Sequence, residues 1–72
     1  MNPPHEMDHQ EVLRLRLQVL EREHRDLDDA IQALEDKGTS DMFTIKRLKK
    51  QKLRLKDQIR FIEDELNPDI IA

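Results

Sequence analysis

The stretch 5–9, HEMDH, is the first part of the chain whose residue types suggest chemistry. It matches the H-E-x-x-H motif, in which two histidines four residues apart on a helix bind zinc and the glutamate acts as general base. That reading would make His5 and His9 ligands and Glu6 the base of a metalloenzyme. A catalytic zinc site also needs a third protein ligand and a shaped cavity. The chain offers no segment to build one, so we expect no metal, no cofactor and no catalysis.

The stretch 46–56, KRLKKQKLRLK, is strongly cationic, with seven basic residues in eleven. Cations along a helix can hold nucleic-acid phosphates. The stretch has no aromatic residue that could stack on bases, and residues 20–36, which we expect beside it, carry seven acidic residues against two arginines. Salt-sensitive, non-specific nucleic-acid binding therefore stays an alternative function. The cations left for it are Lys46, Arg47, Lys50 and Arg54.

Apolar residues recur along the chain at alternating steps of three and four, the pattern of a coiled-coil seam. If the chain folds back near Gly38, its single glycine, two such stripes meet over their whole length in one antiparallel register. The sequence therefore predicts an all-α fold, an antiparallel two-helix coiled-coil hairpin. The stripes are Leu13, Leu17, Leu20, His24, Leu27, Ile31 and Leu34, and Ile45, Leu48, Lys52, Leu55, Ile59, Ile62 and Leu66.

Residues that favour helix ends set the expected boundaries. Asp8 is the expected N-cap of the first helix, because its carboxylate can accept from the N–H groups of the first turn. Gly38 suits a C-cap with positive φ, Ser40 or Asp41 suits the next N-cap, and Pro68 lies where the second helix must stop. The expected division is a flexible arm over 1–7, a helical hairpin over 8–66 and a tail over 67–72, with helices over about 8–37 and 41–66 and a turn over 38–41.

Two polar residues, His24 and Lys52, interrupt the seam in neighbouring layers. Polar residues at such positions fix register and partner number at a cost in stability. Asp28 follows His24 by one turn and lies close to Lys52 in the expected register. We therefore expect His24, Asp28 and Lys52 to form a cluster that locks the register. Because histidine titrates near neutral pH, a pH sensor at His24 stays open as an alternative.

Charged residues beside the seam support the same register. In an antiparallel pair, flanking positions of the same type face each other, and here the facing residues have opposite sign. A wrong register would place like charges together. The expected pairs are Asp28 with Lys49, Glu21 with Lys56, Arg14 with Glu63 and Arg16 with Glu65.

Several apolar residues lie off the seam, and a cluster of this kind on a thin hairpin indicates a partner surface. The seam itself provides few layers, so we expect two or more hairpins to associate as a homo-oligomer, a dimer or a tetramer, in a helical bundle. Binding to a separate protein partner is also expected. The predicted oligomer or partner face consists of Val12, Leu15, Val19 and Phe61; Leu53, Met42 and Phe43 are further outward apolar residues.

The amino-acid composition narrows the fold and the class of protein that the chain can represent. Charged residues make up 40% of the chain and aromatic residues 3%, which fits long helices better than a sheet or barrel. The chain has no cysteine, and so neither a disulfide framework nor a cysteine metal site. No stretch is apolar enough for a signal segment or a membrane span, so we expect a cytoplasmic protein without membrane contact. A net charge of −3 gives no overall attraction to nucleic acid.

The segments LEREHRDLDDAIQALE and IKRLKKQKLRLKDQI together resemble the bacterial YdcH-like family, a domain of unknown function. The shared pattern is E-H-x-x-L-D-x-x-I followed by L-K-K-x-K-L-x-L-K-D-x-I, and it covers about residues 13–62. The resemblance implies a small bacterial cytoplasmic protein that folds as a helical hairpin. It implies no activity, cofactor or catalytic residue, and it lends no role to the arm or the tail.

Overall fold

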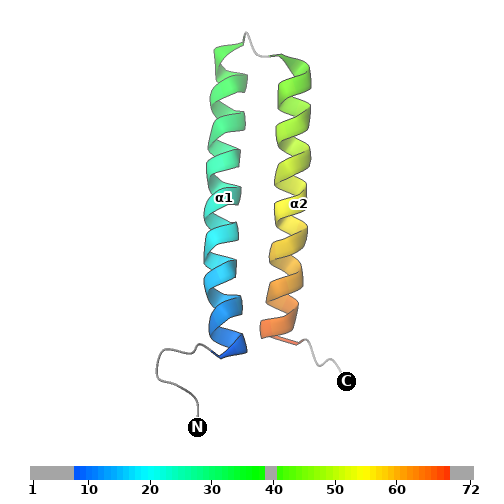
Figure 1. The fold of residues 1–72 in the computed structure, drawn as a ribbon. Helices are drawn as coiled ribbons and strands as arrows, with labels where there is room; N and C mark the ends of the chain where they lie inside the picture. Colours follow the sequence, from blue (N-terminus) through cyan, green and yellow to red (C-terminus); the bar gives the residue numbers. More distant parts are fainter. Residues whose placement is uncertain (1–7, 39–40, 69–72) are drawn as a thin grey trace.

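The protein is a hairpin of two long helices that run antiparallel, side by side (Figure 1). The computed structural model describes residues 8–38 and 41–68. Helix α1 spans His9–Lys37 and helix α2 spans Met42–Leu66. The predicted fold class, an all-α two-helix hairpin, is confirmed.

Helix α1 is capped at both ends by the residues that suit those positions. The Asp8 carboxylate accepts a hydrogen bond of 2.8 Å from the backbone N–H of Glu11, which satisfies one of the free donors of the first turn. At the other end Gly38 has a φ of 69° and donates its N–H to the Glu35 carbonyl at 3.2 Å. The left-handed conformation of Gly38 ends α1 and turns the chain toward α2.

Helix α2 begins at a second aspartate cap. The Asp41 carboxylate accepts from the backbone N–H of Phe43 at 3.0 Å. Of the two caps proposed from the sequence, Asp41 takes the role, while Ser40 lies outside the described residues. The helix ends at Leu66, and its C-cap Asn67 donates its N–H to the Glu63 carbonyl at 2.8 Å. The arm over 1–7 and the last residues, 69–72, also lie outside the described parts of the chain.

The core is the seam between the two helices. Four of its residues are buried, with exposed fractions of 8% for Leu20, 3% for Ile31, 8% for Ile45 and 5% for Ile62. The other residues of the two stripes are half-buried, and Thr44 is the one further described residue that is not exposed. The core is therefore a single line of side chains that stays partly open to solvent along both of its sides.

Candidate interaction surface

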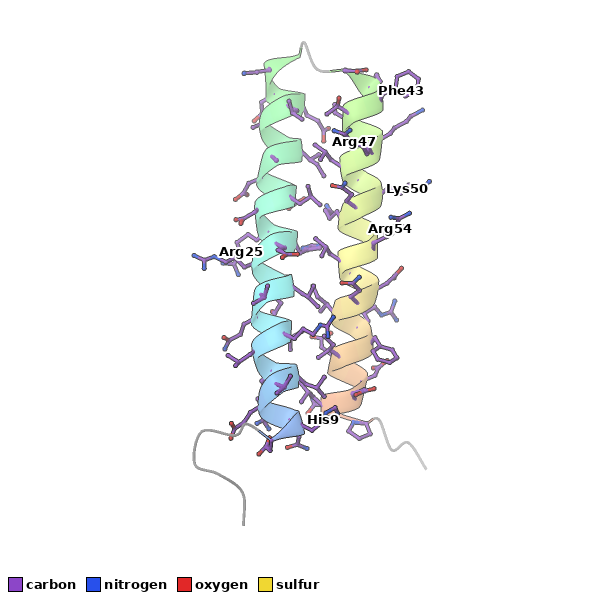
Figure 2. All side chains as sticks on the ribbon, viewed as in Figure 1. His9, Arg25, Phe43, Arg47, Lys50 and Arg54 are labelled. Atoms are coloured by element: carbon purple, nitrogen blue, oxygen red, sulfur yellow. The ribbon has the colours of Figure 1, made fainter. Side chains whose placement is uncertain are left out.

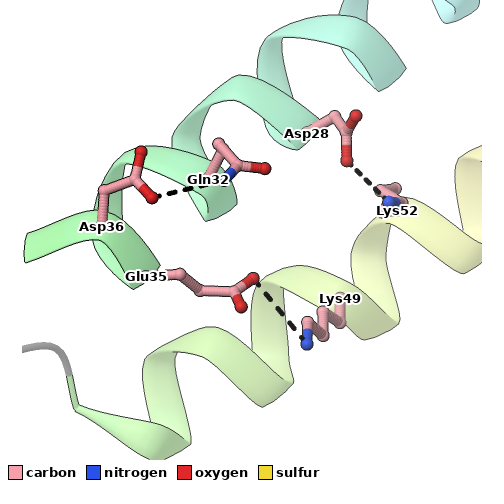
Figure 3. Close-up of polar contacts among 6 residues, drawn as sticks. All are labelled: Asp28, Gln32, Glu35, Asp36, Lys49 and Lys52. Atoms are coloured by element: carbon pink, nitrogen blue, oxygen red, sulfur yellow. Dashed lines mark hydrogen bonds and ion pairs between the residues drawn. The ribbon is translucent and has the colours of Figure 1, made fainter. Parts of the chain in front are cut away.

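Lys52 and Asp28 form the closest polar contact between the helices. The Lys52 ammonium donates to the Asp28 carboxylate, with 2.7 Å between Nζ and Oδ1 (Figure 3). The hydrogen bond from Lys52, together with the charge of Lys52, lowers the pKa of Asp28, and His24 adds a smaller lowering. Lys52 starts in the seam and ends outside it, because its aliphatic stem packs while its charged head reaches water.

His24 lies in the seam one turn before Asp28 and is half-buried. Its Nε2 atom is buried and has no hydrogen-bond partner among the described residues. The structure thus brings Asp28 and Lys52 into contact and leaves the His24 ring without a bond at Nε2. The role of these three residues in locking the register stays a prediction.

The ion pairs beside the seam differ from those expected. Asp28 contacts Lys52 and not Lys49, and Lys49 lies 3.9 Å from Glu35, measured between Nζ and Oε1 (Figure 3). Side chains on a helix lean toward its N-terminus, so in an antiparallel pair Lys49 leans toward the turn and Asp28 leans away from it. Three other expected pairs are not within ion-pair distance either: Glu21 with Lys56, Arg14 with Glu63 and Arg16 with Glu65. The same divergence accounts for the first two of them, which flank the seam on the same side as Asp28 and Lys49.

His9, the one histidine of the H-E-x-x-H string in the described part of the chain, lies at the start of α1. Its Nε2 is 3.7 Å from Oε2 of Glu65, near the end of α2. His5 and Glu6 lie outside the described residues. Within the described ranges no group of three histidine, aspartate or glutamate side chains is placed to hold a metal ion.

The cations proposed for nucleic-acid binding all lie on α2 and are exposed. Lys50 lies on the side of α2 away from α1, as does Phe43 near the turn (Figure 2), whereas Arg54 lines a groove between the two helices. Among the described residues none of these cations takes part in an ion pair. The set is Lys46, Arg47, Lys50 and Arg54. It offers uncompensated positive charge in a protein whose net charge is negative.

The apolar residues proposed as a partner face are exposed. Val12 is 45% exposed, Val19 55% and Phe61 66%. Phe61 borders a shallow groove between the helices whose lining includes the seam residues Leu13 and Leu20. The heptad places Leu15, which is 48% exposed, on the side of α1 opposite α2. Val12, Val19 and Phe61 therefore flank one side of the hairpin, and Leu15 stands at its edge.

A second groove on the same side was not identified from the sequence. It runs over Leu27 and Leu55 and is bordered by Ala30 and Gln51. The sequence indicates this groove only through several uncharged residues that each stand directly before a seam residue. This signal is easily missed, because neutral residues in an otherwise charged helix form no motif.

The described helices include no segment long and apolar enough to cross a membrane. The model of a family described as a protein of unknown function, DUF465, matches residues 17–63. No curated protein matches the chain, and no solved structure does.

Proposed function

Since the chain belongs to the DUF465 family, whose description names no activity, we propose a function from its surface: a non-enzymatic interaction module that associates with itself and binds a protein partner. The proposal assigns no catalysis, because two packed helices form shallow grooves and enzymes bind substrates in concave sites. Membership of the YdcH-like family and a bacterial, cytoplasmic location, which the resemblance implies, form part of the proposal.

The observation that carries the proposal is the exposure of Val12, Val19 and Phe61 beside a seam that is itself only half-covered. Single exposed apolar residues are ordinary on protein surfaces. Here Phe61 borders a groove whose lining includes the half-buried seam residue Leu13, and the heptad places Val12 and Val19 on the same side of the hairpin. A second layer of helices would remove both the exposed residues and the open seam from water. The burial of apolar surface is the main driving force of association.

Light scattering of the purified chain tests self-association, with Val19→Glu as the diagnostic variant. We expect a mass of at least two chains at tens of micromolar for the unchanged protein, and a shift toward one chain for Val19→Glu, because a buried unpaired carboxylate is unfavourable. Leu53→Glu is the matched control, since Leu53 is 60% exposed and lies on the other side of α2. A single-chain mass for the unchanged protein would refute self-association.

The same two variants test the protein partner. Used as baits, Leu53→Glu is expected to retain a co-purifying protein that Val19→Glu loses. Circular dichroism of both variants verifies that the helices remain intact. Equal retention by the two baits would place the partner on another surface.

Non-specific nucleic-acid binding is a second candidate function, supported by the four cations of α2 that form no ion pair with any described residue. Lys46→Gln with Lys50→Gln is expected to weaken retardation of duplex DNA at low salt and to reduce its salt dependence, because each phosphate contact releases counterions. Lys49→Gln is the control, as Lys49 already lies beside Glu35. Equal losses in both variants, or no retardation of the unchanged protein, would exclude this candidate.

A further inference from the structure

The two sides of the hairpin differ in charge. On one side, the positions that flank the seam are charged along both helices, and the contacts of Asp28 with Lys52 and of Glu35 with Lys49 lie there. On the other side, several flanking positions are uncharged. We call this the neutral side, and its uncharged flanking residues are Ala30, Thr44, Gln51 and Gln58.

The seam is accessible from the neutral side. One groove exposes Leu27 and Leu55 between Ala30 and Gln51, and the groove next to it exposes seam residues beside Phe61. At Ala30 and Gln51 another helix can approach without the burial of a charge. Glu23 in the first groove, and Arg16 and Asp57 in the second, would need polar or oppositely charged partners on the incoming helices. A second pair of helices laid over this side would continue the same core, as in a four-helix bundle.

Opposite charges lie along the two edges of the neutral side. Asp26 on α1 and Arg54 on α2 both line the groove over the seam, and neither forms an ion pair among the described residues. Val19 precedes Asp26 by seven residues and Phe61 follows Arg54 by seven. Residues at this spacing form one row along a coiled-coil helix. The row on α1 thus contains Val12, Val19, Asp26 and Ala33, and the row on α2 contains Arg47, Arg54 and Phe61.

The contact of Lys52 with Asp28 shows which residues lie level across the hairpin. Asp26 is two residues before Asp28, and Arg54 is two residues after Lys52, so they lie at the same height. Val19 is nine residues before Asp28, and Phe61 is nine after Lys52, so this pair is level as well. The apolar and charged residues of the two edges are thus matched in height.

We propose that a second copy of this chain packs on the neutral side, about a two-fold axis parallel to the helices. This rotation leaves each residue at its height along the helices and places α1 of one copy opposite α2 of the other. Asp26 then faces the partner's Arg54 and Val19 faces the partner's Phe61, and each contact occurs twice. A two-fold axis perpendicular to the helices, passing at the height of Asp26 and Arg54, would instead place each helix opposite its own copy. Asp26 would then face the partner's Asp26, and Arg54 the partner's Arg54. Like charges disfavour that arrangement.

This inference rests on the self-association proposed above, and cysteine cross-linking tests the arrangement directly. The chain has no cysteine of its own, so Val19→Cys and Phe61→Cys chains can be prepared separately, mixed and oxidised. We expect a disulfide-linked pair of one chain of each kind. With the perpendicular axis, Val19 would instead lie near the partner's Ala33, so a mixture of Val19→Cys and Ala33→Cys chains is the control.

Charge reversal supplies a second readout. Asp26→Arg alone and Arg54→Asp alone are each expected to weaken association about tenfold or more, because each puts like charges at both contacts. The two variants mixed are expected to associate as well as the unchanged chain, since every contact then joins opposite charges. Circular dichroism verifies that each variant is helical before its mass is measured.

The outcomes separate this arrangement from self-association in general. A cross-link between Val19→Cys and Phe61→Cys chains, with recovery in the mixed reversal, supports it. Association without that cross-link, or with the Val19→Cys and Ala33→Cys cross-link in its place, overturns the arrangement and leaves the proposed function standing. A single-chain mass for the unchanged protein overturns both.

Discussion

Lys52 reaches from the seam of the hairpin to the Asp28 carboxylate, with 2.7 Å between its Nζ and the Asp28 Oδ1. The two residues lie on different helices, so the contact aligns α1 and α2 along their length. It also shows how a lysine is tolerated in a seam: the stem stays between the helices and the charged head pairs at the margin, so that the side chain as a whole is 34% exposed.

The first prediction concerns the stability of the hairpin at low pH. Because Lys52 lowers the pKa of Asp28 below its ordinary value of 3.8, the stabilisation from ionised Asp28 is present above that value and is lost as pH falls through the pKa of the folded state. Asp28→Asn should therefore unfold more easily than the unchanged protein at neutral pH, and the difference should disappear in strong acid. Urea unfolding at a series of pH values measures it.

Nuclear magnetic resonance titration of the Asp28 carboxyl checks the cause. The pKa of Asp28 should rise toward 3.8 in Lys52→Met. It should stay where it is in Lys49→Met, because Lys49 contacts Glu35. An unchanged Asp28 titration in Lys52→Met would show that the pair does not persist in solution.

The second prediction is that Lys52→Leu raises thermal stability. An exposed ion pair of this kind contributes little because water screens it, whereas a leucine buried in the seam contributes about 2 kcal/mol. The melting temperature should therefore rise by several degrees. Lys50→Leu, on the side of α2 away from α1 (Figure 2), should give no such rise. A lower melting temperature for Lys52→Leu would mean that its pairing outweighs burial.

If Lys52 also locks the register, the same variant should lose specificity. An all-apolar seam allows other registers and partner numbers of similar stability. Light scattering of Lys52→Leu should then show a broader range of masses than the unchanged protein does. One sharp mass identical to that of the unchanged protein would count against the register role.

The heptad pattern was sufficient to predict the hairpin, because each seam residue repeats the same signal and the errors of single positions cancel. The capping roles of Gly38 and Asp41 could be predicted equally well, since few residue types suit a left-handed C-cap or an N-cap. The ion pairs that flank the seam could not be predicted as well. Heptad positions give the height of Lys49 and Asp28 but not the direction in which their side chains lean, and that direction decides the partner.

The surface that we propose for interaction could be predicted from the sequence only in part, for a related reason. Exposed Val19 and Phe61 are conspicuous in the sequence because they are apolar. Ala30 and Gln51 are not, and they matter only once both helices show that they border one groove. A surface defined by missing charge requires the pairing of the helices to be known first.

The third prediction concerns His24, whose Nε2 is buried and has no hydrogen-bond partner among the described residues. An unsatisfied buried polar atom costs about 1–3 kcal/mol, so His24→Leu should raise the free energy of unfolding by roughly 1 kcal/mol or more. Arg25→Leu is the neighbouring control, because Arg25 points away from α2 (Figure 2). A loss of stability in His24→Leu would show that the ring makes a stabilising bond in solution.

The fourth prediction uses the handedness of the turn at Gly38. Its φ of 69° costs an L-residue about 1 kcal/mol, so Gly38→Ala should destabilise the hairpin by about that amount, and Gly38→Asn by less. An added Cβ would meet no atom within 4 Å, so the cost is one of backbone conformation and not of collision. D-alanine at the same position, introduced by chemical synthesis, prefers positive φ and should instead stabilise the protein by reducing the freedom of the unfolded chain. Urea unfolding of the two alanine enantiomers then gives opposite signs if the left-handed cap is present in solution, and the same sign if it is not.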